Sequence, residues 1–204
     1  MSLRVGVLAS GAGTNLQAIL DRVHGHDGVE VVAVGSDKPG AQSLARARAA
    51  GVATEVFAGA AFPDRAARDD AMAGWLAAHG VELVVLAGYM QLLSPAFLGR
   101  FPQRVINVHP ALLPAFTGIR AVEQALAYGV KVFGVSVHFV DEGVDTGAII
   151  LQRALDLPEA TEAESVRSAL RPVEHELLCE TVRLIARDAV RIDPDNPRRV
   201  LIAS

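Results

Sequence analysis

The chain has 204 residues but only one cysteine, Cys179, so it can form neither an internal disulfide nor a zinc site built from cysteines. Long blocks of Lys or Arg are absent, and the formal net charge of -4 gives no electrostatic footprint for a nucleic-acid backbone. No apolar run is long enough to cross a membrane, and Ser10 and Gly11 interrupt the N-terminal run before it could act as a signal peptide. We therefore expect a cytoplasmic protein that binds neither nucleic acid nor a membrane.

Apolar residues make up 51% of the chain and charged residues 21%, a balance typical of a compact domain rather than of disorder. Strand-like runs alternate with helical segments, which predicts an α/β protein with a mostly parallel twisted sheet flanked by helices. The predicted strands are Arg4–Leu8, Val29–Ser36, Leu83–Ala87 and Val105–Val108, and the predicted helices are Asn15–Val23, Ser43–Ala50 and Asp64–His79. Ligands of such sheets bind beyond the carboxyl ends of the strands. Those segments are Ala9–Thr14, Gly88–Ser94, His109–Gly118 and Asp141–Gly147.

The pattern changes in the second half of the chain. The runs Lys131–Val140 and Ala148–Leu155 predict two longer strands joined by a turn-rich loop, and hence an antiparallel or mixed edge. From Thr161 to about Ala189 apolar residues recur at helical spacing, which predicts a long C-terminal helix that Pro172 starts, kinks or splits. The tail Arg191–Ser204 is expected to be peripheral.

A glycine-rich turn, VLASGAGTNL, joins the first predicted strand to the first predicted helix. Gly11 and Gly13 allow a tight turn whose backbone N–H groups can point at an anion, and this favours a phosphate site. Leu16 stands where the dinucleotide fingerprint has its third glycine, and the Lys of a P-loop is missing. The alternative is a structural turn in which Thr14 or Asn15 caps the helix.

Asn107 and His109 stand two residues apart where a predicted strand ends, so their side chains point to the same side. An amide beside an imidazole suits acyl transfer, because both can donate hydrogen bonds to a developing oxyanion and the imidazolium can give a proton. Asp145 is the carboxylate expected beside His109, where its charge would favour the protonated imidazole. Asp141 and Glu142 are rival carboxylates, and an isolated Asn-x-His can also be an ordinary turn.

Four sequence blocks carry a resemblance over roughly residues 4–188: ASGAGTNLQAIL, VVLAGYMQLLSP, INVHPALLPAFTG and GVSVHFVDEGVDTGAIILQ. In this order they resemble the phosphoribosylglycinamide formyltransferases, the folate-dependent enzymes of purine synthesis. The resemblance implies one Rossmann-like formyltransferase domain over residues 1–204, with a nucleotide-phosphate half at about residues 1–100, a folate and catalytic half at about residues 101–190, and a short tail. It implies direct formyl transfer from 10-formyltetrahydrofolate to the amine of glycinamide ribonucleotide, through a tetrahedral oxyanion and without a metal. Whether the enzyme is a monomer or a homodimer is left open.

Carried over position by position, the resemblance assigns roles to individual residues. The catalytic residues are Asn107, His109 and Asp145. Contacts to the ribonucleotide, beginning with its phosphate, fall on Gly11, Gly13, Thr14, Asn15 and Glu174. Contacts to the folate fall on Arg65, Met90, Gln91, Leu92, Leu93, Asn107, Val140, Asp141, Glu142, Gly143, Val144 and Asp145. Arg65 would face the anionic tail of the folate, and its apolar walls would be Leu86, Leu98, Val105 and Val140.

The chain departs from the family's pattern at two places on the nucleotide side. Ala115 stands where many members carry Lys or Ser, and Arg120–Ala121 replaces a His, Asn or Asp commonly found two residues after the next glycine. These departures leave the expected chemistry in place. They make Arg120 a candidate for supplying the missing charge to the phosphate or the ribose.

Three alternative functions stay open from the sequence. Formyltetrahydrofolate deformylase is a hydrolase that uses similar catalytic residues with water, but it usually carries an extra N-terminal domain, which we do not expect here. Methionyl-tRNA formyltransferase shares the signature, but it has a C-terminal nucleic-acid-binding domain for which the short tail leaves no room. A nucleotide-binding module without catalysis would be supported only by the glycine-rich turn.

Two groups of histidines could instead hold a metal. His24 and His26 lie near Asp27 in a polar turn, where we expect no metal. His138 could join His109 and Asp145 in the metal set of a hydrolase, although a core or supporting histidine is the simpler interpretation.

Overall fold

Strand β1 (Leu3–Leu8) lies at the centre of a parallel sheet in the computed structural model, which describes residues 2–203. This sheet has the order β3-β2-β1-β4-β5, and its other strands are β2 (Val29–Ser36), β3 (Ala53–Val56), β4 (Leu83–Leu86) and β5 (Val105–His109). All four residues of β4 are buried, as expected of a parallel strand that is covered on both faces. Because β2 and β4 lie on opposite sides of β1, the strand order reverses between β1 and β4, and a ligand crevice is expected at their carboxyl ends.

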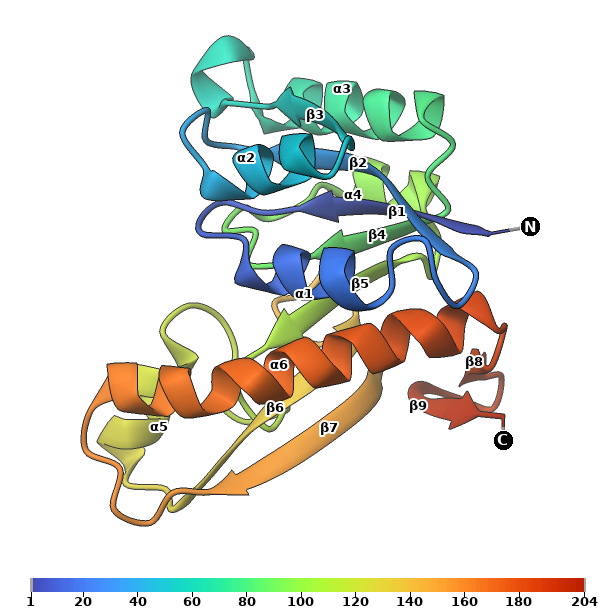
Figure 1. The fold of residues 1–204 in the computed structure, drawn as a ribbon. Coiled ribbons are helices and arrows are strands. Elements are labelled where there is room, and N and C mark those ends of the chain that lie inside the picture. Colours follow the sequence, from blue (N-terminus) through green and yellow to red (C-terminus); the bar gives the residue numbers. More distant parts are fainter. Residues whose placement is uncertain (1, 204) are drawn as a thin grey trace. The chain divides into compact units, whose positions relative to one another are not determined.

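The helices that follow these strands pack against the sheet (Figure 1). They are α1 (Thr14–Arg22), α2 (Gln42–Ala49), α3 (Arg65–Ala78) and α4 (Pro95–Arg100). A short 3₁₀ turn (Gly59–Ala61) before α3 is exposed. Asp64 caps α3 by accepting a hydrogen bond from the Ala67 N–H at 2.8 Å. Helix α4 is capped by Ser94, whose hydroxyl accepts from the Phe97 N–H, and Pro95 opens the helix. The chain divides into two compact units after Asn107, within β5.

The second unit contains β6 (Val132–Phe139) and β7 (Ile149–Asp156), which pair antiparallel, so the predicted change of strand direction is confirmed. Helix α5 (Ala121–Tyr128) precedes them and the long helix α6 (Ala163–Ala186) follows. Helix α6 packs on β6 and β7 through an apolar stripe (Figure 1). The fully buried members of that stripe include Val166, Leu170, Leu177, Leu178 and Val182.

The expectation that Pro172 starts or splits the C-terminal helix is wrong, because α6 continues through the proline and buries apolar residues on both sides of it. The expected kink stays a prediction. The tail forms an antiparallel hairpin of β8 (Val190–Asp193) and β9 (Asn196–Ile202), and β9 pairs with β7. Cys179 is buried in α6 as a free thiol.

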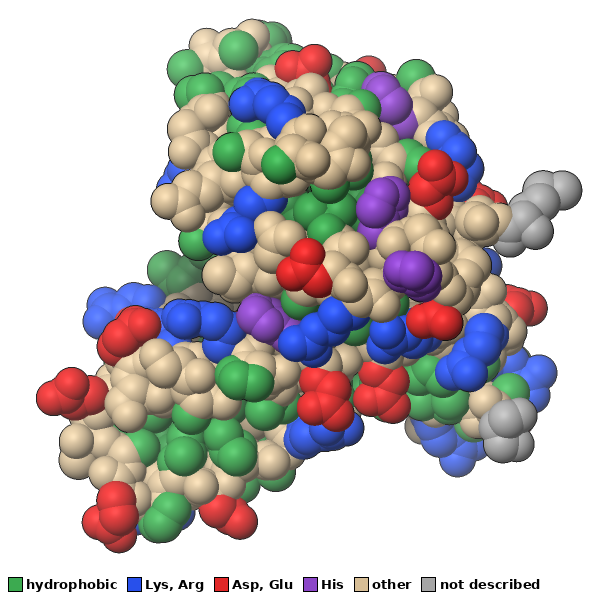
Figure 2. Space-filling model, viewed as in Figure 1, with side chains coloured by type: hydrophobic (Ala, Val, Ile, Leu, Met, Phe, Trp, Pro, Cys, Tyr) green, Lys and Arg blue, Asp and Glu red, His purple; other side chains and the backbone are tan. Residues whose placement is uncertain are grey.

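The exposed side of α6 carries charges of both signs. Figure 2 shows Lys or Arg side chains next to Asp or Glu side chains along this helix. Glu164 pairs with Arg167 and Arg171, and Arg153 of β7 pairs with Glu176. Within residues 2–203, no helix is long and apolar enough to cross a membrane.

Candidate active site

The glycine-rich loop between β1 and α1 is shaped by a close approach of α2. Gly13 is the N-cap of α1 with φ of 70°, and a Cβ there would lie 2.7 Å from the Cα of Ser43. Both the positive φ and this approach require glycine. The alternative that Thr14 or Asn15 caps the helix is wrong, because the N-cap residue is Gly13 and both Thr14 and Asn15 lie inside the helix. The N-terminal end of α1 therefore retains the features of an anion site.

Helix α2 also holds this loop in place through the side chain of Arg46. Arg46 donates from Nε to the carbonyl oxygen of Ala12 at 2.8 Å and from Nη1 to the Gln17 side chain at 2.9 Å. The Ser43 N–H donates to the carbonyl oxygen of Gly11 at 3.2 Å. Sequence reasoning missed these contacts, because nothing in the local pattern of α2 indicates that it packs against the first loop.

The loop after β4 is tied to the loop after β1 at the carboxyl ends of the two strands. The Ser10 N–H donates to the Gly88 carbonyl at 3.1 Å, and the Met90 N–H donates to the Ser10 hydroxyl at 2.9 Å. Two apolar side chains beyond this junction are exposed, Met90 by 61% and Leu92 by 57%. The predicted phosphate loop and the start of the predicted folate segment thus lie side by side.

Two other residues that the sequence predicts for the site, Asn107 and Arg65, also belong to the first unit. Asn107 is half-buried on β5, in register with Leu86 of β4, whose end leads into the folate segment. Arg65 is exposed at the first position of α3.

In the second unit, His109 lies against the carboxylate of Asp145. The two side chains are 6% and 13% exposed, and His109 Nδ1 is 3.3 Å from Asp145 Oδ2. The other ring nitrogen, Nε2, is 2.8 Å from the carbonyl oxygen of Phe116, which can only accept and so fixes a hydrogen on Nε2. Both ring nitrogens of His109 therefore face hydrogen-bond acceptors. The expected neighbour of His109 is therefore Asp145, and not its rivals Asp141 and Glu142, which are exposed in the same loop.

The charge of Asp145 is stabilised by several partners. Burial raises the pKa of the carboxyl, but hydrogen bonds from His138 and the Gly118 N–H, together with the charges of His109 and His138, outweigh burial and lower the pKa to about 2. The Gly118 N–H donates to Oδ2 at 2.7 Å. Asp145 therefore remains a carboxylate throughout the physiological pH range.

His138 of β6 supports this carboxylate from the other side. It is 2% exposed, its Nε2 is 3.4 Å from Asp145 Oδ1, and its Nδ1 is 2.7 Å from the Phe139 carbonyl oxygen. Its placement fits the sequence interpretation of a supporting histidine. Among the described residues, 2–203, no three or more His, Cys, Asp or Glu side chains form a group that could hold a metal ion. In the predicted turn near Asp27, His24 instead accepts a hydrogen bond from the Val31 N–H at 3.0 Å.

The loop that carries Asp145 has an internal framework. Asp141 accepts from the Gly143 N–H at 3.1 Å and from the Thr146 hydroxyl at 2.6 Å. A Cβ at Gly147 would lie 1.8 Å from the Phe139 carbonyl oxygen, so this position requires glycine. Asp145 has φ of 53°, a left-handed conformation that Asp tolerates better than most residues. The loop thereby fixes the direction of the Asp145 side chain.

The other predicted residues of the second unit lie outside this hydrogen-bonded cluster. Val140 is half-buried at the end of β6, whereas Glu142, Gly143 and Val144 are exposed. Glu174 is half-buried on α6. Arg120 has φ of 63° at the start of α5, and its exposed side chain approaches Glu123 at 3.9 Å. The Leu113–Pro114 bond is cis.

Comparisons with known proteins agree over nearly the full chain. Residues 3–182 match the Formyl transferase family. The phosphoribosylglycinamide formyltransferase of Mycobacterium tuberculosis is 43% identical over 195 residues, which cover 93% of this chain and 87% of that protein. The crystal structure of glycinamide ribonucleotide transformylase 1 from Symbiobacterium toebii has a TM-score of 0.95 and 48% identity, covering 100% of this chain and 95% of that chain. The trifunctional purine biosynthetic protein adenosine-3 of Chironomus tentans is 40% identical, and the match covers 93% of this chain but 14% of that protein.

The Rossmann-like fold, the glycine-rich loop and the buried histidine–carboxylate pair define an α/β group-transfer enzyme. The chain belongs to the formyl transferase family. The relative from Mycobacterium tuberculosis, which this chain covers almost entirely, is a phosphoribosylglycinamide formyltransferase. The family and the fold predicted from the four sequence blocks are thereby confirmed, whereas the roles of individual residues stay predictions.

Proposed function

We propose that this enzyme transfers the formyl group of 10-formyltetrahydrofolate to the amine of glycinamide ribonucleotide, giving formylglycinamide ribonucleotide and tetrahydrofolate in de novo purine biosynthesis. The observation that carries the proposal is the match to phosphoribosylglycinamide formyltransferases over almost the whole chain. Members of the formyl transferase family use formyltetrahydrofolate as cosubstrate. The buried contact between His109 and Asp145 supports the proposal, because formyl transfer benefits from a proton donor at the carbonyl oxygen.

In the proposed reaction the amine attacks the formyl carbon directly, and the carbonyl oxygen becomes an oxyanion. The Asn107 amide and the protonated His109 ring donate hydrogen bonds to this oxyanion, where such donors have their largest effect. For this step the His109 Nε2–H must leave the Phe116 carbonyl oxygen, which it faces at 2.8 Å in the structure. Asp145 keeps His109 oriented, and it relays the proton of the attacking amine through water to the leaving folate nitrogen. Collapse of the tetrahedral intermediate breaks the bond to the folate nitrogen, which receives a proton, so that protons balance over the cycle.

Two anchors would orient the nucleotide. The loop residues Gly11, Gly13, Thr14 and Asn15 would bind its phosphate at the start of α1, where backbone N–H groups and the helix dipole attract an anion. Glu174 would accept hydrogen bonds from the ribose hydroxyls or the glycinamide end. A ligand held at both ends presents its amine in one direction, which favours attack on the formyl carbon.

The formyl donor would bind along Met90–Leu93 and Val140–Asp145, with Arg65 facing its anionic tail. The exposed apolar side chains of Met90 and Leu92 support this placement, because a flat ring system can cover them. We place the enzyme in the cytoplasm, where a single buried free cysteine stays reduced.

An assay of formyl transfer tests the proposal directly. The purified protein is mixed with 10-formyltetrahydrofolate, and formate and formylglycinamide ribonucleotide are measured with and without glycinamide ribonucleotide. We expect folate turnover only with the nucleotide, with one formyl group transferred for each folate consumed. Release of formate at full rate without the nucleotide would overturn the transferase proposal and favour a hydrolase.

A further inference from the structure

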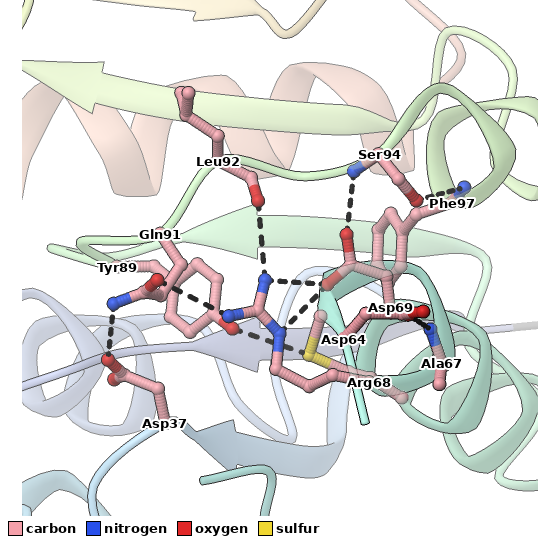
Figure 3. A network of polar contacts seen from close by, with 11 residues as sticks. Asp37, Asp64, Ala67, Arg68, Asp69, Tyr89, Gln91, Leu92, Ser94 and Phe97 are labelled. Atoms are coloured by element: carbon pink, nitrogen blue, oxygen red, sulfur yellow. Dashed lines mark hydrogen bonds and ion pairs between the residues drawn. The ribbon is translucent and has the colours of Figure 1, made fainter. Parts of the chain in front are cut away.

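A buried ion pair on α3 lies outside the proposed catalytic residues. Arg68 and Asp69 are 4% and 0% exposed, and the Arg68 guanidinium donates from Nε and Nη2 to Asp69 Oδ1 at 3.0 and 2.7 Å. Figure 3 shows the pair facing the chain between β4 and α4. Burying two charges costs desolvation energy that their mutual attraction alone often fails to offset. Such a pair is therefore a weak source of stability, and its other contacts indicate what it does.

Those other contacts all fall on one segment, Tyr89–Ser94, which we call the 89–94 segment. Arg68 donates from Nη1 to the Gln91 side-chain oxygen and from Nη2 to the Leu92 carbonyl oxygen, both at 3.3 Å. Asp69 accepts from the Ser94 N–H through Oδ2 at 2.7 Å. One ion pair thus holds the segment at three points, two of them on its main chain (Figure 3).

The two ends of the segment are fixed as well. Tyr89 is buried, its hydroxyl lies 3.8 Å from the Met72 sulfur, and burial raises its pKa to about 12, so it stays neutral. The Met90 N–H donates to the Ser10 hydroxyl at 2.9 Å. Ser94 caps α4. A stretch without regular secondary structure is therefore tied down along its whole length.

The direction of the Gln91 side chain is also determined. Its oxygen accepts from Arg68, and its NH₂ group donates to Asp37 Oδ2 at 3.1 Å, so the amide bridges a donor and an acceptor. Meanwhile the apolar side chains of Met90 and Leu92 remain 61% and 57% exposed. The segment thus has an anchored polar side toward α3 and an apolar side toward solvent.

We propose that Arg68 and Asp69 are positioning residues for the formyl donor: they hold the 89–94 segment in the conformation that binds the folate ring system. The inference rests on the proposed function, because it takes the 89–94 segment as part of the folate site. Neither residue touches the reacting atoms. Their effect is preorganisation, since a segment fixed before binding loses less conformational entropy when the ligand arrives.

The decisive variant is Arg68→Lys. A lysine ammonium can still neutralise Asp69, but it lacks the planar fork that reaches Leu92 and Gln91 at the same time. We expect KM for 10-formyltetrahydrofolate to rise about tenfold, because hydrogen bonds from a charged donor are lost. The kcat and the KM for glycinamide ribonucleotide should change by less than about twofold, because the hydrogen bonds from Arg46 and Ser43 to the nucleotide loop are unchanged. A general structural defect would instead lower kcat and raise both KM values.

Two further variants complete the experiment. Asp70→Asn is the matched control, because Asp70 neighbours Asp69 on α3 but forms an exposed ion pair with Arg100, and neither KM should change. Asp69→Asn keeps the shape of the side chain but removes the charge that orients Arg68, and it should raise the folate KM about threefold. If Arg68→Lys does not fold, Asp69→Asn decides the question. A wild-type folate KM in a folded Arg68→Lys protein, or in Asp69→Asn when that variant decides, overturns the proposal.

Binding separates this proposal from the proposed function. Tetrahydrofolate is titrated onto wild-type protein and the Arg68→Lys variant without any nucleotide, and tryptophan fluorescence or calorimetry gives the Kd. If wild-type protein binds tetrahydrofolate but transfers no formyl group to glycinamide ribonucleotide, the proposed function fails while the positioning role remains testable through the Kd. Equal Kd values in the two proteins overturn the positioning role even if the transfer activity is confirmed.

Discussion

Gly118 donates its backbone N–H to Asp145 Oδ2 over 2.7 Å, although 27 positions separate the two residues in sequence. The same oxygen lies 3.3 Å from His109 Nδ1, so a main-chain group fixes the carboxylate that faces the imidazole. An asparagine at this position could keep the bond from Gly118 through its carbonyl oxygen. Asp145→Asn therefore removes the charge while preserving this attachment.

We expect Asp145→Asn to lower kcat by about 100-fold, because the neutral amide no longer favours a protonated His109 as the oxyanion donor. The measurement is a pH–rate profile of formyl transfer for both proteins. Glu176→Gln, the same chemical change at an exposed ion pair with Arg153, is the control and should keep wild-type activity. Superimposable profiles for Asp145→Asn and wild type would remove the carboxylate from the mechanism.

Asp145 should also make the stability of the protein depend on pH in the acid range. Its pKa is about 2 in the folded protein against an ordinary value of 3.8, so ionisation stabilises the folded state above about pH 4. As the pH falls from 4 to 2, this contribution of about 2 kcal/mol is lost. Urea unfolding at a series of pH values measures the free energy of unfolding of both proteins. The difference in this free energy between wild type and Asp145→Asn should shrink as the pH falls over that range. A difference that stays constant between pH 6 and pH 2.5 would contradict the assignment.

Asn107→Ala and His109→Ala should each lower kcat by about 10²–10³, because each removes one proposed donor to the oxyanion. Circular dichroism and thermal unfolding should show that both variants fold. His26→Ala replaces an exposed turn histidine and serves as the control for the loss of an imidazole. Either residue whose removal leaves kcat near the wild-type value has no part in the chemistry.

The sequence could predict those parts of the fold whose information is local. The sequence predicts both ends of strand β1 and of helix α1 to within one residue, because an apolar run marks each element and glycines mark the turn between them. Strand β3 was missed, since its four residues Ala53–Val56 are only partly buried and show little pattern. The tail hairpin was missed as well, because its pairing with β7 depends on a partner far away in sequence.

Some residues of the candidate site could likewise be predicted from local sequence, and others could not. The neighbourhood of His109 and Asp145 could be anticipated, because both follow predicted strands. The role of Arg68 could not, since an Arg–Asp dipeptide on a helix normally indicates a solvent-exposed face. Its burial arises from the packing of α3 beneath the 89–94 segment, which no local pattern encodes. Arg46 escaped prediction for the same reason.

Thr14→Asp should raise the KM for glycinamide ribonucleotide at least tenfold, because a carboxylate at the first position of α1 repels the phosphate. The folate KM should stay within about twofold of wild type, since the folate is proposed to bind along other segments. Thr14→Ser keeps the hydroxyl and should behave as wild type. High salt should narrow the difference between Thr14→Asp and wild type, because it screens the repulsion. If both KM values rise equally, the loop does not bind the phosphate selectively.

The two glycines of the nucleotide loop should differ sharply when each is replaced by alanine. Gly13 has φ of 70° and a Cβ there would lie 2.7 Å from both Cα and Cβ of Ser43, whereas a Cβ at Gly11 would meet nothing within 4 Å. Gly13→Ala must therefore adopt a strained left-handed conformation and push α2 away from the loop, which should cost about 1–3 kcal/mol of folding free energy. Gly11→Ala should change the free energy of unfolding by less than about 0.5 kcal/mol, as expected for a substitution into open space. Urea unfolding of the two variants measures both values, and equal stabilities would show that the approach of Ser43 does not constrain the loop.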